Sequence, residues 1–207
     1  NNLWRAVAYA CHPDAWGVQI VFDNQVILGT RARKTRTKSF NAFSSIDYPE
    51  TAMFRDRRLI QFLQRPAEYT HAVFSTALDP NVFVLRLVPG MRADIIPMLE
   101  GRYRALVLES FGVGGLPGGD DGAMFAAVRD WCGAGHLAVF TTQVPHEGSD
   151  LAVYEVGRAA KALPGVLEAH DMTPEATAVK LMWVLGQTTD RAEAEKLFLT
   201  PVQWDIL

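Results

Sequence analysis

The fold class is indicated by the stretch Leu106-Val107-Leu108-Glu109-Ser110-Phe111-Gly112-Val113-Gly114-Gly115-Leu116-Pro117. The residues from Ala105 to Leu108 form a short continuous apolar run, which is typical of a strand buried on both faces of a parallel sheet. A glycine-rich loop follows and continues to Gly118 and Gly119. Because ligands of open α/β sheets bind at the carboxyl ends of the strands, we expect this loop at a ligand-binding edge.

Working outward from this stretch, strand and helix patterns alternate. Thr173-Pro174 is a strong helix start, because the hydroxyl can cap the helix and proline at the first position loses no hydrogen bond. Crossovers of this length indicate parallel βαβ units, so we expect residues 81–207 to form a small doubly wound α/β domain. The patterns predict strands at 82–88, at 137–141 and within 159–169, and helices at 91–99, from Asp120 or Asp121 to about Cys132, from Thr173 onward, and at 190–199.

Residues 1–50 have a different pattern. A helix begins at Asn1 or Asn2, either of which can cap it. Two apolar runs between residues 18 and 28 flank Asp23-Asn24, a pair that tolerates left-handed geometry, and this predicts a β-hairpin. A basic loop follows. These residues are too few to close a core alone, so we interpret 1–50 as the tail of a larger α/β domain whose upstream part is missing.

Residues 51–80 show no long periodicity, and Pro66 and Pro80 interrupt them. Helix-like and extended fragments alternate there. We therefore interpret 51–80 as an interdomain connection between the tail domain and the second domain.

Composition excludes several classes of protein. The chain has 207 residues, 49% hydrophobic and 21% charged, which is ordinary for a globular protein. The formal net charge of −3 argues against a nucleic-acid-binding protein, which is usually strongly basic. No apolar run approaches the ~18–20 residues that a membrane span needs, so no membrane partner is expected. Cys11 and Cys132 match no zinc or redox spacing, which suggests a reducing compartment or carries no information.

The glycine-rich loop has two interpretations. It could cradle a phosphate, but Pro117 occupies the third-glycine position of a dinucleotide-binding motif, and no Lys-Ser/Thr follows as in a P-loop. A tight turn that needs positive φ angles is therefore favoured.

The basic stretch 30–38 has three interpretations, which the sequence leaves open. It could bind phosphates, or it could be a solvated loop, which the net charge favours. One of its lysines could instead have a pKa lowered by burial and neighbouring cations, so that it takes or relays a proton. The five cations are Arg31, Arg33, Lys34, Arg36 and Lys38.

Other candidate chemistry is sparse. The five histidines show no metal-binding spacing, so neither a metal nor a cofactor is expected. His146-Glu147 could belong to an acid/base site, although a polar loop after a strand is favoured. Met182 and Trp183 are interpreted as core or subunit-interface residues. There is no GxSxG motif, and the chain shows no self-sufficient catalytic constellation.

Several segments, in this order, resemble the L-asparaginase family and its bacterial cytoplasmic branch. They are Gly29-Thr30-Arg31-Ala32-Arg33-Lys34-Thr35, Phe40-Asn41-Ala42-Phe43, the stretch 106–117, Thr141-Thr142-Gln143 with Asp150 and Tyr154-Glu155-Val156-Gly157, and Asp171-Met172-Thr173-Pro174-Glu175-Ala176-Thr177.

The resemblance implies an amidohydrolase that converts asparagine, or a related amide, to the acid and ammonia through an acyl-threonine. In the family the nucleophilic threonine belongs to an N-terminal segment that this sequence lacks, so this chain alone is expected to be inactive. The resemblance implies no cofactor. It also implies a cytoplasmic homodimer or homotetramer, because family active sites lie where one subunit's N-terminal domain meets a neighbour's C-terminal domain.

The resemblance also implies roles for particular residues. Lys34 matches the catalytic lysine, which hydrogen-bonds a Thr–Asp pair and assists proton transfer from the nucleophile. Gly115, Ser149 and Asp150 are expected in the loop that reaches a neighbouring subunit's substrate.

Two positions depart from the family's pattern. The family usually has asparagine at the position of Gly115, so one contact to substrate is lost here. Glu109 stands where cytoplasmic relatives often place a cation, and it could pair with Arg33. Because the chain lacks any nucleophile, an alternative interpretation is a non-catalytic C-terminal module for dimerisation or for binding a small amino acid.

Overall fold

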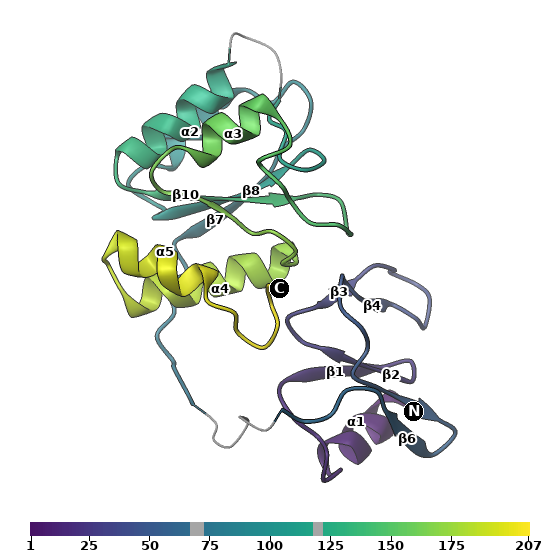
Figure 1. Cartoon of the computed structure of the whole chain (residues 1–207). Coiled ribbons are helices and arrows are strands. Elements are labelled where there is room, and N and C mark those ends of the chain that lie inside the picture. The colour runs from purple at the N-terminus through teal and green to yellow at the C-terminus, as the bar shows by residue number, and fades with distance from the viewer. Residues whose placement is uncertain (67–72, 118–121) are drawn as a thin grey trace. The chain divides into compact units, whose positions relative to one another are not determined.

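The computed structural model describes residues 1–66, 73–117 and 122–207, which form two compact units, Asn1–Thr76 and Ala77–Leu207 (Figure 1). Among these described residues, no sheet or core cluster is shared between the two units. The residues expected to begin the helix before Cys132, Asp120 and Asp121, lie outside the described residues, as do Gly118 and Gly119.

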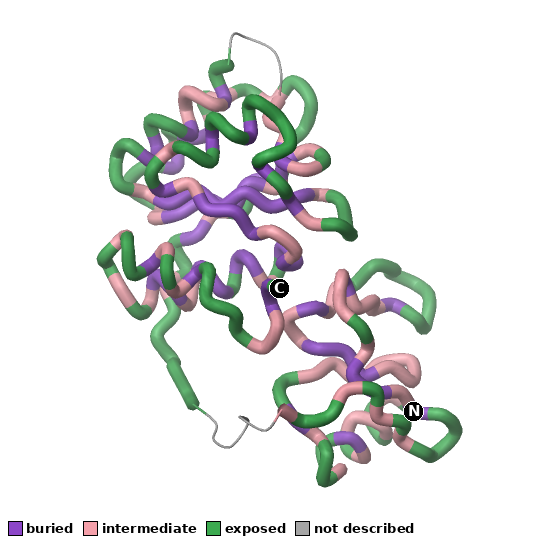
Figure 2. Tube along the Cα trace, in the orientation of Figure 1, coloured by how far each residue is buried: buried purple, intermediate pink, exposed green. Residues whose placement is uncertain are grey.

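The second unit is built on a parallel sheet. The strands β7 to β10 lie in the order β10-β9-β8-β7, and each neighbouring pair is parallel. The sheet is the most buried part of the unit (Figure 2), as the apolar runs predict. The predicted α/β domain with a parallel sheet is confirmed, but its strands are added in chain order with the crossover helices on one face, so the winding is one-sided and not double as expected. The strands are β7 Val82–Arg86, β8 Ala105–Ser110, β9 Leu137–Thr142 and β10 Val166–Glu168.

Two pairs of helices cover the two faces of this sheet, one pair on each face. The strands are added in chain order, and the crossover helices α2 (Ala123–Gly133) and α3 (Glu155–Lys161) both pack on one face. The last two helices, α4 (Pro174–Gln187) and α5 (Arg191–Leu199), cover the other face (Figure 1). The crossover helices therefore lie on one side, and the C-terminal helix pair closes the second side.

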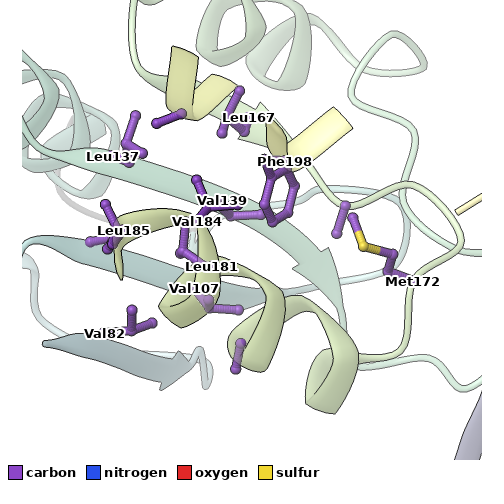
Figure 3. Close-up of a cluster of buried hydrophobic side chains, with 14 of the residues drawn as sticks. Val82, Val107, Leu137, Val139, Leu167, Met172, Leu181, Val184, Leu185 and Phe198 are labelled. Atoms are coloured by element: carbon purple, nitrogen blue, oxygen red, sulfur yellow. The ribbon is translucent and has the colours of Figure 1, made fainter. Parts of the chain in front are cut away.

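Alternation along the strands divides the core between these faces. Val107 and Val139 point toward α4 and α5, where they meet Leu181, Val184 and Phe198 (Figure 3). Their strand neighbours pack in the opposite cluster, against α2 and α3. Because successive strand side chains point to opposite faces, a run without polar residues is what a sheet covered on both sides requires.

The predicted starts of the last two helices are confirmed. Thr173 Oγ1 accepts from the backbone N–H of Ala176 at 3.1 Å, and Pro174 is the first helical residue. Asp190 caps α5 in the same way, accepting from the N–H of Glu193 at 2.8 Å. Each cap satisfies an N–H group that has no partner inside its helix.

One predicted element in this unit needs correction. The helix expected at 91–99 is wrong: the segment forms two 3₁₀ turns, Ala93–Ile95 and Pro97–Leu99. Pro97 explains the difference, because it lacks an N–H group and its ring clashes with the preceding helical turn. The sequence patterns do not predict helix α3, whereas the short strand expected within 159–169 is confirmed as β10.

The first unit consists of one helix and short antiparallel strands. The helix α1 (Asn2–Ala10) contacts β1. Asp23 and Asn24 have φ angles of 47° and 71°, so the predicted left-handed turn is present between β1 and β2. The strands are β1 Gln19–Phe22, β2 Gln25–Leu28, β5 Ala52–Arg55 and β6 Arg58–Gln61 in one sheet, and β3 Ala32–Lys34 and β4 Phe43–Ser45 in a second.

Part of the segment interpreted as a connection is integrated into this unit. Strand β5 pairs with β2, and β6 pairs with β5. The small core of the unit accordingly includes Ala52 and Phe54 beside Tyr9 and Val26. Residues 1–50 do not close this core alone; the hairpin made by β5 and β6 completes it.

Candidate functional site

The carboxyl edge of the parallel sheet gathers polar side chains at the strand ends. Ser110 Oγ donates to the carbonyl oxygen of Thr141 at 2.6 Å, which links the ends of β8 and β9. The Gln143 amide donates to the carbonyl oxygens of Leu87 at 2.6 Å and Glu109 at 2.8 Å. These side-chain bonds link the ends of neighbouring strands, so the positions from which the loops begin are fixed.

The glycine-rich loop after β8 is a closed turn. The N–H groups of Gly114 and Gly115 donate to the Phe111 carbonyl oxygen at 3.0 and 2.7 Å, and Phe111 N–H donates back to Gly115. Gly112 and Gly114 have φ angles of 49° and 149°, which favour glycine. Because the N–H groups of Gly114 and Gly115 are used within the turn, this geometry favours the tight turn over a phosphate cradle.

The segment Ser149–Leu151 is held by three successive backbone N–H groups. Ser149 N–H donates to the His170 carbonyl oxygen at 2.8 Å, and Asp150 N–H donates to the Val113 carbonyl oxygen at 2.8 Å. Leu151 N–H donates to Glu168 Oε1 at 2.7 Å. The bond from Asp150 to Val113 holds this segment beside the turn that contains Gly115.

Close packing fixes this arrangement. A Cβ atom at Gly114 would lie 2.5 Å from Leu151 Cδ2, and one at Gly148 would lie 2.5 Å from the His170 carbonyl oxygen. At Gly115 a Cβ atom would lie 3.2 Å from the Phe111 carbonyl oxygen. A side chain at Gly115 therefore needs a small shift of the turn.

Exposure differs between the two polar residues of this segment. Ser149 is buried, whereas Asp150 is exposed. Asp150 Oδ1 accepts from the N–H of Ala152 at 2.9 Å, which fixes the orientation of the carboxylate. This edge can therefore present a negative charge to a ligand.

Glu168, at the end of β10, is buried and binds the Ser149–Leu151 segment through the Leu151 N–H group. Its side chain is 4% exposed, and Lys161 Nζ of α3 lies 2.9 Å from Glu168 Oε2. The hydrogen bond to Glu168 raises the pKa of Lys161 above its usual value, so the lysine stays charged. His170 Nδ1 lies 3.9 Å from the same carboxylate oxygen.

Lys34 lies in the other unit, at the end of β3. It is exposed, and in the β3–β4 ladder it is opposite Phe43, whose ring packs edge-on against Phe22 at 5.3 Å. Beyond it the Thr35 and Ser44 hydroxyl oxygens are 2.8 Å apart. Lys34 thus projects from a braced hairpin. The site residues fall in two separate units: Lys34 in the first, and Gly115, Ser149 and Asp150 in the second.

Glu109 has a cationic partner within the second unit. Glu109 Oε2 lies 3.4 Å from Arg86 Nη1, on the neighbouring strand and directly opposite in register. His146 and Glu147 lie in an exposed loop after β9, as favoured. Trp183 is partly buried against the core under α4.

Within residues 1–66, 73–117 and 122–207, no group of three or more His, Cys, Asp or Glu residues is placed to hold a metal ion. In the same ranges, no helix has both the length and the apolar character needed to cross a bilayer.

Comparison with protein families assigns both units. The model of the glutaminase/asparaginase C-terminal domain matches residues 81–198, and that of the asparaginase N-terminal domain matches residues 1–68. The chain belongs to the asparaginase family. The resemblance found in the sequence is therefore confirmed, and the two matched regions correspond to the two units of the structure.

Relatives within the asparaginase family carry two different names. The L-asparaginase of Thermococcus kodakarensis is 38% identical over 198 residues, which are 95% of this chain and 59% of that protein. A glutamyl-tRNA(Gln) amidotransferase subunit of Metallosphaera sedula is 33% identical over 178 residues, 83% of this chain and 39% of that protein. The solved structure of the thermostable T. kodakarensis L-asparaginase matches 100% of this chain and 62% of its own, with a TM-score of 0.91 and 34% identity.

Sequence reasoning missed Glu168, Lys161 and the Leu151 amide. Their contacts join a helix, a strand and a loop, so no short spacing reveals them. One signal was available: Glu168 and Lys161 are the two charged residues of the otherwise small and apolar segment 159–169, and a buried charge needs a partner.

Proposed function

We propose that the protein containing this chain is an L-asparaginase-like amidohydrolase. It adds water to asparagine or a related amide, giving the carboxylic acid and ammonia, through an acyl-threonine whose threonine is not in this chain. The observation that carries the proposal is the 38% identity to an L-asparaginase over 95% of the chain. Since the chain spans 59% of that relative, we propose that these residues alone are inactive.

Lys34 is proposed as the catalytic lysine. An amine on a braced hairpin can accept a proton from the nucleophilic threonine through an adjacent Thr–Asp pair and return it to the leaving ammonia. The support is positional: Lys34 ends β3, and the next turn of the hairpin is fixed by the Thr35–Ser44 contact.

Gly115, Ser149 and Asp150 are proposed to contact substrate from a neighbouring subunit. The exposed carboxylate of Asp150 suits the α-ammonium group of an amino acid, because the two charges attract. This arrangement requires a second copy of the chain, so the proposal includes a homodimer or homotetramer. It also includes a cytoplasmic location, as for the bacterial branch that the sequence resembles.

A second candidate is an amidase that supplies ammonia to a partner protein. It is favoured by the 33% identity to a glutamyl-tRNA(Gln) amidotransferase subunit. The two candidates differ in substrate preference and in dependence on a partner: a stand-alone enzyme hydrolyses free asparagine, whereas one component of an amidotransferase acts with its partner and tRNA.

The test measures ammonia release by the natural protein that contains this chain, with asparagine and with glutamine. We expect Lys34→Ala to lower kcat by about 10²–10⁴-fold, the usual contribution of a positioned proton-transfer group. Lys38→Ala, an exposed cation in the same hairpin, is the matched control and should retain activity. Full activity of Lys34→Ala would contradict the role of Lys34, and activity only with a partner and tRNA would favour the second candidate.

A further inference from the structure

Three consecutive amides hold the segment Ser149–Leu151, and their acceptors differ in kind. Ser149 and Asp150 donate to backbone carbonyl oxygens, of His170 and Val113. Leu151 donates to the Glu168 carboxylate at 2.7 Å. A carbonyl acceptor is present whatever the side chain, so Glu168 is the contact among these three that a side-chain substitution can remove.

The Glu168 carboxylate is placed to hold this amide firmly. The side chain is 4% exposed, and a buried carboxylate is costly unless hydrogen bonds and an opposite charge compensate it. Here Leu151 N–H occupies Oε1, and Lys161 Nζ lies 2.9 Å from Oε2. Both oxygens are therefore engaged, and neither can turn away without losing a charge-assisted bond.

The groups held by Glu168 belong to different elements. Lys161 is the last residue of α3, Leu151 is buried in the core under α2 and α3, and Leu151 also fills the space beside Gly114. A shift of Leu151 would move the preceding Asp150, whose N–H is bonded to the glycine turn at Val113. Glu168 thus connects α3 and β10 to the turn that contains Gly115.

We propose that Glu168 is a positioning residue that holds the Ser149–Leu151 segment, and with it the Asp150 carboxylate, against the glycine turn for contact with substrate. This inference rests on the proposed function, since it takes Asp150 as a substrate contact. Glu168 acts through the segment and does not touch substrate. Binding contacts that are equal in the ground state and the transition state affect KM, so loss of Glu168 raises KM more than it lowers kcat.

The first readout is amide hydrogen exchange at Leu151 in the natural protein. Glu168→Ala removes the acceptor, and we expect exchange at Leu151 to accelerate by at least about tenfold, with Asp150 following. Glu168→Gln keeps a carbonyl acceptor, so Leu151 should remain closer to the unchanged protein. Glu100→Ala, an exposed carboxylate elsewhere in the unit, is the control for general destabilisation.

The second readout is kinetics with asparagine in the same proteins. We expect Glu168→Ala to raise KM by about tenfold with a smaller change in kcat, and Glu168→Gln to recover part of KM. If Glu168→Ala lowers kcat about tenfold and leaves KM unchanged, the inference is overturned. Unchanged hydrogen exchange at Leu151 in Glu168→Ala overturns it as well. If the unchanged protein hydrolyses no amide, the proposed function fails, whereas the exchange result still decides whether Glu168 holds the segment.

Discussion

Two lysine–carboxylate pairs in the second unit have nearly equal lengths and equally buried carboxylates, but their lysines differ in exposure. Lys161 and Glu168, at the carboxyl edge of the sheet, are 2.9 Å apart, and the lysine side chain is 50% exposed. Lys180 and Asp205, which join α4 to the C-terminal segment, are 2.8 Å apart, and each side chain is 4% exposed. The distances alone would suggest equivalent interactions.

Burial separates the two pairs. Desolvation lowers the pKa of Lys180, against the opposing effect of the bond to Asp205, whereas the bond to Glu168 raises the pKa of Lys161. Lys180 also donates to the Thr200 carbonyl oxygen at 2.8 Å, and Asp205 accepts from Val202 N–H at 2.7 Å. The first pair therefore positions an edge segment, while the second is a buried network whose removal leaves costly orphaned groups.

The largest expected effect comes from breaking the buried pair. Lys180→Met leaves the Asp205 carboxylate buried without its cation, so we expect the free energy of unfolding to fall by about 3–5 kcal/mol. Denaturant unfolding monitored by circular dichroism measures this. Adding Asp205→Asn removes the orphaned charge while keeping an acceptor for Val202, and should restore part of the loss. A loss below about 1 kcal/mol in Lys180→Met would contradict the comparison.

A smaller effect is expected at the edge. Lys161→Met leaves the 4% exposed Glu168 carboxylate without its cation but with its bond from Leu151 N–H. Because the lysine is half exposed, water can reach the vacated position, so we expect the free energy of unfolding to fall by about 1–3 kcal/mol. The same unfolding experiment measures it, with Lys196→Met as a control, because Lys196 is 75% exposed and 3.9 Å from Glu193. If Lys161→Met lowers the free energy of unfolding as much as Lys180→Met does, the exposure of the lysine does not determine how much each pair stabilises the fold.

The smallest expected effect is a difference in pH dependence. Native Lys180 has a pKa below the ordinary 10.5, so it binds fewer protons than the unfolded chain in the window just below 10.5, and its contribution to stability rises with pH there. Native Lys161 has a pKa above 10.5, so its contribution is complete below 10.5 and is lost as pH rises through the native value. Unfolding of each Met variant and the unchanged protein, compared between about pH 8 and 11, measures both slopes. Slopes of the same sign would contradict the assignment.

The sequence predicts those elements whose signals are local. The turn at Asp23-Asn24 and the helix starts at Thr173 and Asp190 depend on the residues that form them, and the structure has all three. The helix expected at 91–99 fails for a local reason as well, because Pro97 outweighs the apolar spacing around it.

Contacts between distant segments are what the sequence does not reveal. From the sequence, the residues of β5 are interpreted as part of an interdomain connection, because only the structure shows that they pair with β2. Similarly, Gly115, Ser149 and Asp150 became candidates through family resemblance, and Glu168 became one only once the Leu151 amide was seen to bind it. A charged residue in an apolar segment signals that a partner exists, and the fold identifies the partner.

The one-sided winding of the second unit has a consequence for its synthesis. Because the strands join the sheet in chain order, each new parallel pairing closes only one crossover of chain, which keeps the loop-closure entropy of each step low. The four strands can therefore assemble as they leave the ribosome, with α2 and α3 covering one face. The opposite face, with Val107 and Val139, is covered only by α4 and α5, which are synthesised after the four strands. We expect a nascent chain that ends before Thr173 to carry an apolar sheet face open to chaperones.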